Sequence, residues 1–237
     1  MTEIKELNDP SLRKIIKNKK QVVLIPVGSI EQHGPHLPIS TDSDIVSEIA
    51  NQVSKKTNCL LMPTINYGVS FEHSPFFNVS ITESTLEKIL VDICISLQKN
   101  GINDIIILNG HHGNQHSLVH VPKKVLKISK RNVRVLIFSY WNFMKREFDH
   151  AGFVETSIML AISNKVKMSR ATKGLVIEGM SPKEKTRIRR LATKSFINAT
   201  KNGIWGDPRK ATKKDGQKIL VEIVQNLVKK VKVALQT

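Results

Sequence analysis

The order of apolar and polar positions along the chain predicts strands that alternate with helices. Short runs rich in β-branched residues are typical of buried strands, and four such runs occur at 21–28, 59–65, 104–110 and 133–138. Apolar residues at helical spacing occur over 43–56, 83–99 and 115–129, from about Phe153, and in a terminal stripe of Ile219, Ile223, Leu227 and Val231. This alternation implies a mostly parallel sheet.

Three polar loops follow predicted strands. Their sequences are GSIEQHGPHLPISTDSD (28–44), NGHHGN (109–114) and DHAGFVETS (149–157). In open α/β sheets, functional loops gather at the carboxyl ends of the strands, where chain reversals and helix N-termini form a crevice. We therefore expect these loops to contribute to one site.

Composition narrows the class of protein. The 237 residues are 40% apolar and 24% charged, an ordinary globular balance that excludes a disordered or fibrous chain and favours one domain over 1–237. No run reaches the roughly 18 apolar residues of a membrane span, and residues 1–20 lack the apolar centre of a signal peptide. We expect a soluble, cytoplasmic protein in which Cys59 and Cys94 are reduced core thiols.

The charge balance raises a second class of function. The chain has 37 basic and 20 acidic residues, a net charge of +17, so it attracts anionic partners. Basic runs at 183–190, 209–214 and 229–232 suggest a nucleic-acid-binding protein. However, the chain has only two Trp and two Tyr for base stacking, and it shows no helix-turn-helix, zinc-finger or RNA-recognition pattern. We therefore interpret the basic runs as solvated faces and do not expect nucleic acid as the partner.

The histidines point to a metal site. All eight lie between positions 33 and 150. Glu31 and His33 are two residues apart, so in an extended loop their side chains point the same way, and Asp42 closes the same loop. Carboxylate and imidazole ligands together suit Zn, Mn or Fe(II) better than calcium. The alternative is a polar loop in which Asp42 or Asp44 caps the next helix and the histidines face solvent.

The other two loops add candidates of the same kind. His111 follows the strand predicted at 104–110, between glycines that let the backbone bend closely around a ligand. His150 precedes a helix, and the pKa of histidine near neutrality suits a general acid or base. Glu155 lies in the first turn of that helix, a position that also fits an ordinary helix start.

At these loops the sequence resembles the creatininase family of metal-dependent amidohydrolases. The resemblance is carried by PVGSIEQHGPHLPISTD (26–42), NGHHGN (109–114) and HAGFVETS (150–157), with further agreement at YGVSFEH (67–73) and GIWGDPRKAT (203–212). It implies a single α/β domain of three αβα layers around a mostly parallel central sheet. It also implies two divalent metal ions per subunit (Fe2+, Zn2+ or Mn2+) and a symmetric homo-oligomer.

The resemblance also implies residue roles by position. Glu31 and His111 resemble the ligands of one metal. His33 resembles a ligand of the second metal, and Asp42 resembles the bridge between the two.

Gly113 stands where true creatininases carry a glutamate that binds the second metal. Glu155 is the expected replacement, as it looks to be in family members with a glycine here. His150 resembles the catalytic proton donor, so His150 and Glu155 are the predicted catalytic residues. The predicted substrate contacts are Glu72, His73, Asn109 and His112.

The substrate expected from the resemblance is a formamide. Creatininase places tryptophans near the HAG motif, whereas here Trp141 precedes the charged stretch MKREFD, so creatinine is not the expected substrate. Two subfamilies share the glycine: an archaeal deformylase of riboflavin and deazaflavin-cofactor synthesis, and a peptidase that trims a redox-cofactor precursor peptide. The basic composition favours the deformylase, whose substrate is a formylamino-pyrimidine ribonucleotide monophosphate. One loop departs from the family, reading FFNVS (76–80) where relatives read FPGT.

The resulting hypothesis is removal of formate from that ribonucleotide. A hydroxide shared by the two metals attacks the formamide carbonyl, and His150 delivers a proton to the departing ring amine. The alternatives within the family are hydrolysis of a cyclic amide such as creatinine or of the cofactor-precursor peptide.

Overall fold

The computed structural model describes residues 2–18, 20–129 and 132–236. The described strands form one five-stranded sheet in the order β1-β3-β2-β4-β5, and every neighbouring pair is parallel. The strands are β1 (Thr2–Glu3), β2 (Val22–Val27), β3 (Leu60–Leu61), β4 (Asp104–Asn109) and β5 (Arg134–Ser139). The predicted parallel sheet is confirmed.

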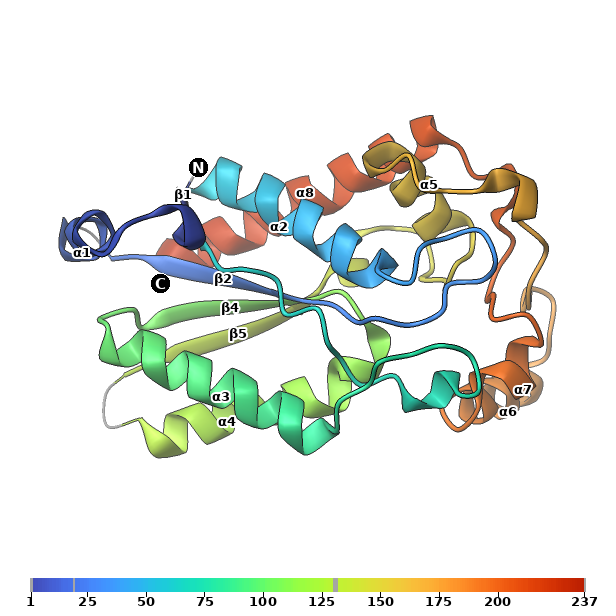
Figure 1. The fold of residues 1–237 in the computed structure, drawn as a ribbon, viewed down its shortest axis with the longest axis horizontal. Helices are drawn as coiled ribbons and strands as arrows, with labels where there is room; N and C mark the ends of the chain where they lie inside the picture. Colours follow the sequence, from blue (N-terminus) through green and yellow to red (C-terminus); the bar gives the residue numbers. More distant parts are fainter. Residues whose placement is uncertain (1, 19, 130–131, 237) are drawn as a thin grey trace.

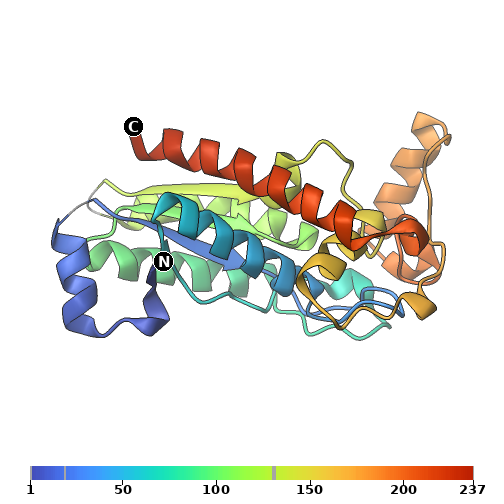
Figure 2. The same ribbon diagram turned by 90° about the horizontal axis from the view of Figure 1, so that it is seen from above.

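Helices cover both faces of this sheet (Figure 1). One face is covered by α2 (Thr41–Thr57), α5 (Phe153–Ile162) and α8 (Lys213–Gln236), and the other by α3 (Glu83–Lys99) and α4 (Gln115–Ile128). The other described α-helices are α1 (Asp9–Asn18), α6 (Pro182–Ala192) and α7 (Phe196–Thr200). α6 and α7 lie at the opposite end of the molecule from the C-terminus (Figure 1, Figure 2). The expected three-layer αβα architecture is confirmed.

The central strands are buried on both faces, which explains their continuous apolar sequences. Successive side chains of β2 and β4 enter two separate cores. Leu24 and Ile106 pack on the side of α2 and α8, whereas Val23 and Ile105 pack on the side of α3 and α4.

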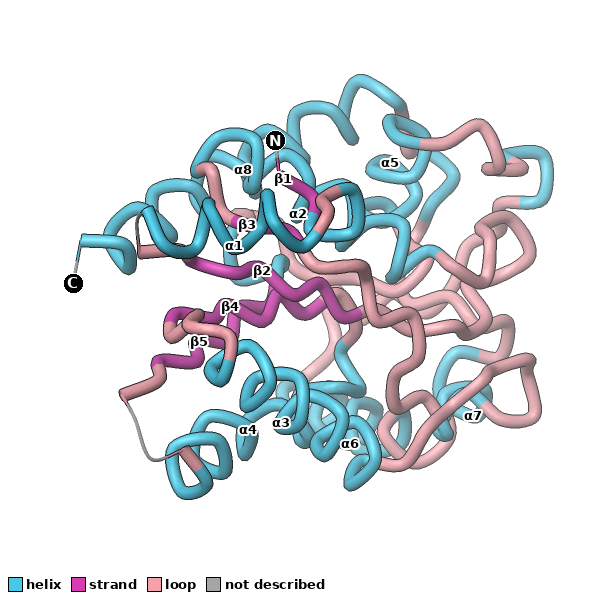
Figure 3. Tube along the Cα trace, turned by 60° about the vertical axis from the view of Figure 1, so that its left-hand side comes forward, coloured by secondary structure: helices cyan, strands magenta, loops and turns pink. Residues whose placement is uncertain are grey.

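The strand order reverses at β2. β3 lies on one side of β2, and the chain then crosses to β4 on the other side. In open parallel sheets such a reversal opens a crevice at the carboxyl ends of the two strands. The loops after β2, β4 and β5 lie toward this end of the sheet (Figure 3). The topology therefore brings together the loops that the sequence singles out.

Several elements differ from the sequence prediction. The strand expected over 59–65 is reduced to β3, with Ile65 making a single bridge to Val27, because Pro63 has no backbone N–H to continue the ladder. The prediction lacks β1, α1, α6 and α7. In α6 the sole buried residue is Ala192, so this helix has no apolar stripe from which it could be predicted.

Other expectations concern the surface and the core. The basic runs at 183–190, 209–214 and 229–232 consist mostly of exposed residues, as interpreted from the sequence. Cys59 and Cys94 are both buried, as expected of core cysteines. Within the described ranges, no helix has the length and apolar character needed to cross a membrane.

Candidate metal centre

The loop after β2 carries the first two candidate ligands. Backbone hydrogen bonds fix this loop: Glu31 N donates to Ile39 O at 3.0 Å, and Gln32 N donates to Phe77 O at 2.9 Å. The side chains of Glu31 and His33 are completely buried. These histidine and carboxylate groups therefore do not face solvent, in contrast to the alternative considered from the sequence.

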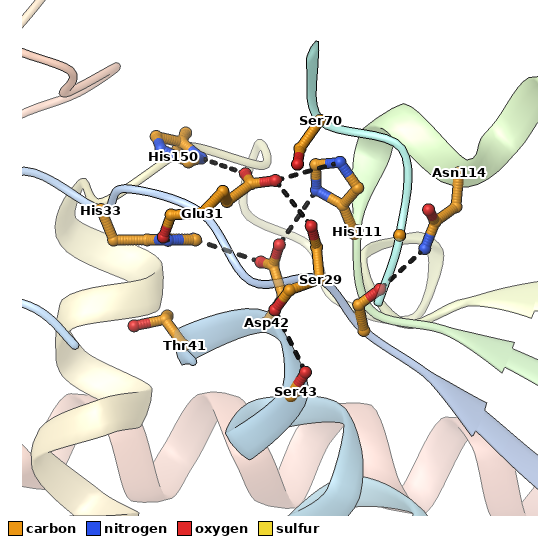
Figure 4. Close-up of polar contacts among 12 residues, drawn as sticks. Ser29, Glu31, His33, Thr41, Asp42, Ser43, Ser70, His111, Asn114 and His150 are labelled. Atoms are coloured by element: carbon orange, nitrogen blue, oxygen red, sulfur yellow. Dashed lines mark hydrogen bonds and ion pairs between the residues drawn. The ribbon is translucent and has the colours of Figure 1, made fainter. Parts of the chain in front are cut away.

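Asp42 lies in the first turn of α2, where the helix dipole favours a carboxylate. Its side chain points between two imidazoles (Figure 4). His33 Nε2 lies 3.2 Å from Asp42 Oδ1, and His111 Nδ1 lies 2.9 Å from Asp42 Oδ2. One carboxylate thus connects the loops that follow β2 and β4.

His111 follows β4 and makes a second contact with the first loop. Its Nε2 lies 3.2 Å from Glu31 Oε2 and 2.8 Å from Val69 O. Because a carbonyl oxygen can only accept, Nε2 carries a hydrogen and Nδ1 is the nitrogen that faces Asp42. Ser29 Oγ donates to Glu31 Oε2 at 2.9 Å and orients that carboxylate.

Two buried asparagines hold the loops together. Asn114 Nδ2 donates to Gly28 O at 3.1 Å, and Asn114 Oδ1 accepts from Val69 N at 3.0 Å. Asn109 Nδ2 donates to Ser139 Oγ at 3.3 Å, and Asn109 Oδ1 accepts from the backbone N–H two residues further on at 3.1 Å. Asn109, a predicted substrate contact, therefore lies where it supports the loop.

Glu155, in the first turn of α5, joins the same cluster. It is completely buried, its Oε2 accepts from Ala151 N at 2.7 Å, and the same oxygen lies 3.6 Å from His33 Nε2. Tyr140, directly after β5, donates its hydroxyl hydrogen to Glu155 Oε1 at 3.4 Å. Asp149 accepts a hydrogen bond of 2.8 Å from a backbone N–H in the first turn of α5 and fixes the start of the helix.

The ligand atoms of these residues form groups in which all distances are within 4.8 Å. Two groups share Asp42: Glu31, Asp42 and His111 form one, and His33, Asp42 and Glu155 form the other. Glu31 Oε1 and Asp42 Oδ2 are buried without a well-aligned hydrogen bond, although imidazole nitrogens lie close to both. Converging carboxylate and imidazole groups with such unsatisfied oxygens fit divalent cations of the Zn, Mn or Fe(II) type.

Without a cation, protons balance the charge of this cluster. Burial lowers the pKa of His33 and His111, but the neighbouring carboxylates outweigh burial and raise both pKa values to about 10. Burial would raise the pKa of Asp42, yet these two imidazolium groups hold it well below its usual range. Burial raises the pKa of Glu155 to about 8. Cation binding must therefore displace protons.

Gln32 sets the tautomers of two histidines beside the cluster. Its side-chain amide has two hydrogens and three neighbours: Gly203 O at 3.2 Å, His73 Nδ1 at 2.9 Å and His150 Nε2 at 3.1 Å. The carbonyl can only accept, and His73 takes the second hydrogen at the shortest distance. His150 Nε2 therefore donates its own hydrogen to the backbone carbonyl oxygen of Gln32, 3.0 Å away. This leaves the lone pair on His150 Nδ1, which lies 3.8 Å from Glu31 Oε1.

His150 is an uncharged group at the edge of the cluster. Burial lowers its pKa well below the usual range, and the nearby positive charge of His33 lowers it further. Its ring packs on that of His33 at 4.2 Å and on that of Phe196 at 4.7 Å between centroids. At neutral pH the imidazole is therefore neutral and presents one proton-accepting atom, Nδ1.

The other predicted substrate contacts occupy different environments. His73 is buried, with Nε2 3.1 Å from Glu31 Oε1. Glu72 is partly buried beside it, and burial raises the pKa of this carboxyl. His112 is exposed and stacks on Trp141 with 6.0 Å between ring centroids. Of the four predicted contacts, His112 has the most open position.

Gln32, Tyr140 and Phe196 also contribute to this arrangement and are absent from the sequence prediction. Gln32 lies within the first motif, so its place between two candidate ligands is a usable signal. Tyr140 is completely buried directly after β5. Phe196, on α7, packs on the ring of His73 at 4.6 Å between centroids. Phe196 lies outside all the motifs and follows the basic run at 183–190, so no local sequence pattern marks it as part of the site.

Gly113 leaves no space for the glutamate found there in true creatininases. A Cβ atom at this position would lie 2.2 Å from Val69 O, 2.5 Å from His111 Nε2 and 3.0 Å from Glu72 Oε1. Any side chain here would displace the backbone or the imidazole that faces Asp42. The absence of a side chain is thus a packing requirement of this loop.

A cavity of about 780 Å³ lies away from this cluster. Its walls come from α2, the residues after β3 and the end of α5, and they include Asp44, Asn51, Thr64 and Lys165. None of the candidate metal ligands lines it. The converging ligand atoms therefore lie outside this cavity.

Comparisons with known proteins identify a family and several relatives. A family model described as creatininase, creatinine amidohydrolase, matches residues 5–231. The chain is 33% identical over 218 residues to the mycofactocin precursor peptide peptidase of Mycolicibacterium smegmatis. The aligned region covers 89% of this chain and 84% of that relative. It is 28% identical over 144 residues, 60% of each chain, to the 2-amino-5-formylamino-6-ribosylaminopyrimidin-4(3H)-one 5'-monophosphate deformylase of Methanosphaera stadtmanae.

Solved structures share the fold. A structure described as creatininase Mn matches with a TM-score of 0.83 at 21% identity and covers 98% of both chains. A creatininase variant of the Zn-Zn type also matches with a TM-score of 0.83, at 22% identity, and covers 98% of this chain and 97% of the other. These matches extend over nearly all of both chains, so the architecture is the same.

Proposed function

The chain belongs to the creatininase family, and from this premise we propose that it is a dinuclear enzyme that hydrolyses an amide bond of a peptide. As a creatininase-family metal amidohydrolase, it acts on carbon–nitrogen bonds. Beyond that activity, we propose the metal ligands, the residue that transfers the proton and the class of substrate.

The sharing of Asp42 by two ligand groups carries this proposal. Glu31, Asp42 and His111 would hold one divalent cation, and His33, Asp42 and Glu155 would hold the second. A carboxylate common to both groups keeps two cations close together, as two-metal hydrolysis requires.

The chain's own residues prepare both ligand groups. When bound, two such cations supply an activated water and polarise the amide carbonyl. Ser29 orients Glu31, whereas Tyr140 and the backbone N–H of Ala151 orient Glu155. Loss of a hydrogen bond of this kind typically lowers metal affinity or activity by about 10- to 100-fold.

His150 is proposed to transfer the proton. Its Nδ1 accepts a proton from the attacking water and returns it to the amide nitrogen, which leaves as an amine. Gln32 O holds the Nε2–H of the same ring and fixes its orientation. Phe196 covers part of the ring and limits the access of bulk water to it.

A peptide suits the surface beside the centre better than a phosphate does. The segments 21–54 and 57–87, which include the loops after β2 and β3, contain no lysine or arginine. They expose three aromatic side chains, Tyr67, Phe71 and Phe77, by 52%, 54% and 60%. Exposed apolar groups next to a site favour an apolar ligand surface. The similarity to a precursor peptide peptidase over 89% of this chain supports the same substrate class.

The deformylase reaction expected from the sequence is the second candidate. The net charge of +17 and the similarity to a deformylase over 60% of the chain favour it. Its phosphate-bearing substrate needs a cationic group near the centre. The loops after β2 and β3 supply none, so we rank it below the peptide.

Product analysis separates these candidates. Protein loaded with Mn2+, Zn2+ or Fe2+ under anaerobic conditions is incubated with short synthetic peptides that end in apolar residues, with the formylamino-pyrimidine ribonucleotide, or with creatinine. We expect new amino groups from the peptides with wild type and none with Asp42→Ala. Formate release from the nucleotide would establish the deformylase instead. Metal binding without turnover of any peptide would reject the proposed substrate class.

A further inference from the structure

α6 is a short helix with a cationic and almost fully exposed surface. Five of the eight residues 183–190 are lysine or arginine. The single acid among them, Glu184, is engaged in a capping box with Ser181. Only Ala192 is buried within this 11-residue helix. Because helices of this length are marginal in water without packing, α6 gains from a partner that covers its exposed side.

One side of α6 presents a row of cations. Lys183, Arg187 and Arg190 line a groove of about 480 Å³ together with Pro182 and Thr186. Their spacing of three and four residues places them on the same side of the helix. At a rise of 1.5 Å per residue, the row spans about 10 Å.

α7 connects this row to the candidate metal centre. Phe196 follows Arg190 by six residues, a path of at most about 20 Å. Its ring packs on His73 at 4.6 Å and on His150 at 4.7 Å between centroids. α6 and α7 form an arm, residues 182–200, at the end of the molecule opposite the C-terminus (Figure 1, Figure 2). A ligand bound along α6 is therefore within reach of the centre.

We propose that this arm binds an acidic segment of the peptide substrate and so presents the amide bond to the centre. The inference rests on the proposed peptide-directed activity. The acidic residues of the peptide pair with Lys183, Arg187 and Arg190. Its apolar residues near the cleaved bond contact the lysine-free surface that exposes Phe71 and Phe77.

The spread of charge on α6 favours an extended acidic chain over other anions. A single phosphate group pairs with cations that converge on one point, whereas this row extends over about 10 Å. Single-stranded nucleic acids are held by cations interleaved with aromatic side chains, and α6 contains no aromatic residue. Carboxylates along a peptide match the row in both charge and length.

Two matched triple variants test the arm. The first carries Lys183→Gln, Arg187→Gln and Arg190→Gln. The control carries Lys229→Gln, Lys230→Gln and Lys232→Gln, which are exposed on α8 at the opposite end of the molecule. Each variant loses the same charge, and glutamine preserves helix propensity. A fluorescent glutamate-rich peptide is titrated with metal-loaded protein at about 0.15 M salt, and short single-stranded RNA and inorganic phosphate are tested in parallel.

We expect the α6 variant to bind the peptide about tenfold more weakly, the combined effect of three exposed charge pairs, and the α8 variant to bind like wild type. Equal losses of peptide affinity in both variants would show that the net charge of the protein causes the effect, and would overturn the proposal. Tighter binding of RNA, or displacement of the peptide by low millimolar phosphate, would also overturn it. Circular dichroism verifies folding. Because this assay measures binding without turnover, failure of the hydrolysis assay is a separate result.

Discussion

At the scale of single residues, Asp42 is the point where two loops and two ligand groups meet. Its two oxygens face different imidazoles, at 3.2 Å and 2.9 Å. A buried carboxylate is costly unless it is paired, and here two imidazolium groups pair with it until cations replace their protons. Those protons therefore preserve the arrangement that the cations need.

The proposed ligand role of Glu155 predicts a change in metal content. Glu155→Ala should reduce the bound metal from two ions to one per chain, because Asp42, Glu31 and His111 still form a complete group. Elemental analysis after dialysis measures this ratio. The control, Glu72→Ala, removes a nearby carboxylate outside both groups and should leave two ions bound. Two ions in Glu155→Ala would contradict the assignment.

Gln32 is predicted to affect turnover without affecting metal content. Gln32→Met removes the hydrogen bond to His73 Nδ1, so the ring of His73, a predicted substrate contact, loses its fixed tautomer. Turnover should therefore fall, whereas both ligand groups stay intact. Long-range nitrogen–proton NMR of the histidine rings reports the tautomers directly. Gln98→Met, at a buried glutamine of α3, is the control. Unchanged ring spectra in Gln32→Met would refute the assignment of hydrogens.

Metal binding is predicted to release protons. His33 and His111 have pKa values of about 10 without a cation, and Glu155 has a pKa of about 8. All three groups are therefore mostly protonated at pH 7.5, and binding must displace between about two and three protons. Affinity should therefore rise as pH increases and level off above about pH 10. Calorimetry at pH 7.5 in buffers of different ionisation enthalpy measures the release. An enthalpy that does not depend on the buffer would contradict these pKa directions.

The site residues that could be predicted most directly from the sequence are those in short motifs. Glu31 and His33 are two residues apart in an extended loop, so their side chains point the same way. Asp42 lies at the end of the same loop, so local geometry already brings these three residues near one another. The approach of Glu155 to His33 comes only with the packing of α5 on the sheet. Their roles as metal ligands stay predictions. Phe196 was not predictable, because an aromatic residue after a basic helix has no local pattern that points toward two distant histidines.

At the scale of elements, the centre depends on loops that pack closely and are joined by hydrogen bonds. Asn114 bonds the loop after β4 to Gly28 and Val69, and Gly113 lies directly against the same segment. These contacts hold three chain segments in one position before any ligand binds. Such rigid support is what a preorganised site requires.

Gly113→Ala tests this close packing. The added Cβ would meet Val69 O at 2.2 Å, so we expect a loss of about 1–3 kcal/mol in the free energy of unfolding and weaker metal binding. Thermal unfolding and metal titration measure the two effects. Gly179→Ala is the control, since its Cβ meets nothing within 4 Å but its positive φ strains the backbone. A loss of metal affinity in Gly179→Ala as well would assign the effect to general instability.

Elements with strong apolar patterns were predictable, and elements without them were not. β2 and β4 were expected because both of their faces enter a core. β3 is shorter than predicted, since the apolar run at 59–65 includes Pro63, which cannot continue a ladder. α6 has no buried stripe, so its sequence indicated only a solvated basic run.

At the scale of the whole molecule, charge is unevenly distributed along a common fold. The net charge is +17, yet segments 21–54 and 57–87 have no lysine or arginine. The architecture matches creatininase structures over nearly the whole chain. Because a fold alone does not determine the substrate, the proposed selection rests on side chains of the loops and of the α6–α7 arm. The fold class was predictable from the alternation of strands and helices. The role of the two segments without lysine or arginine was not, because only the topology brings their loops beside the centre.

The most direct test of the account is anomalous X-ray diffraction from crystals of the protein loaded with Zn2+ or Mn2+. We predict two anomalous peaks about 3.5–4 Å apart, with Asp42 between them, one peak beside Glu31 and His111 and the other beside His33 and Glu155. A single peak, or two peaks that do not share Asp42, would contradict the dinuclear centre.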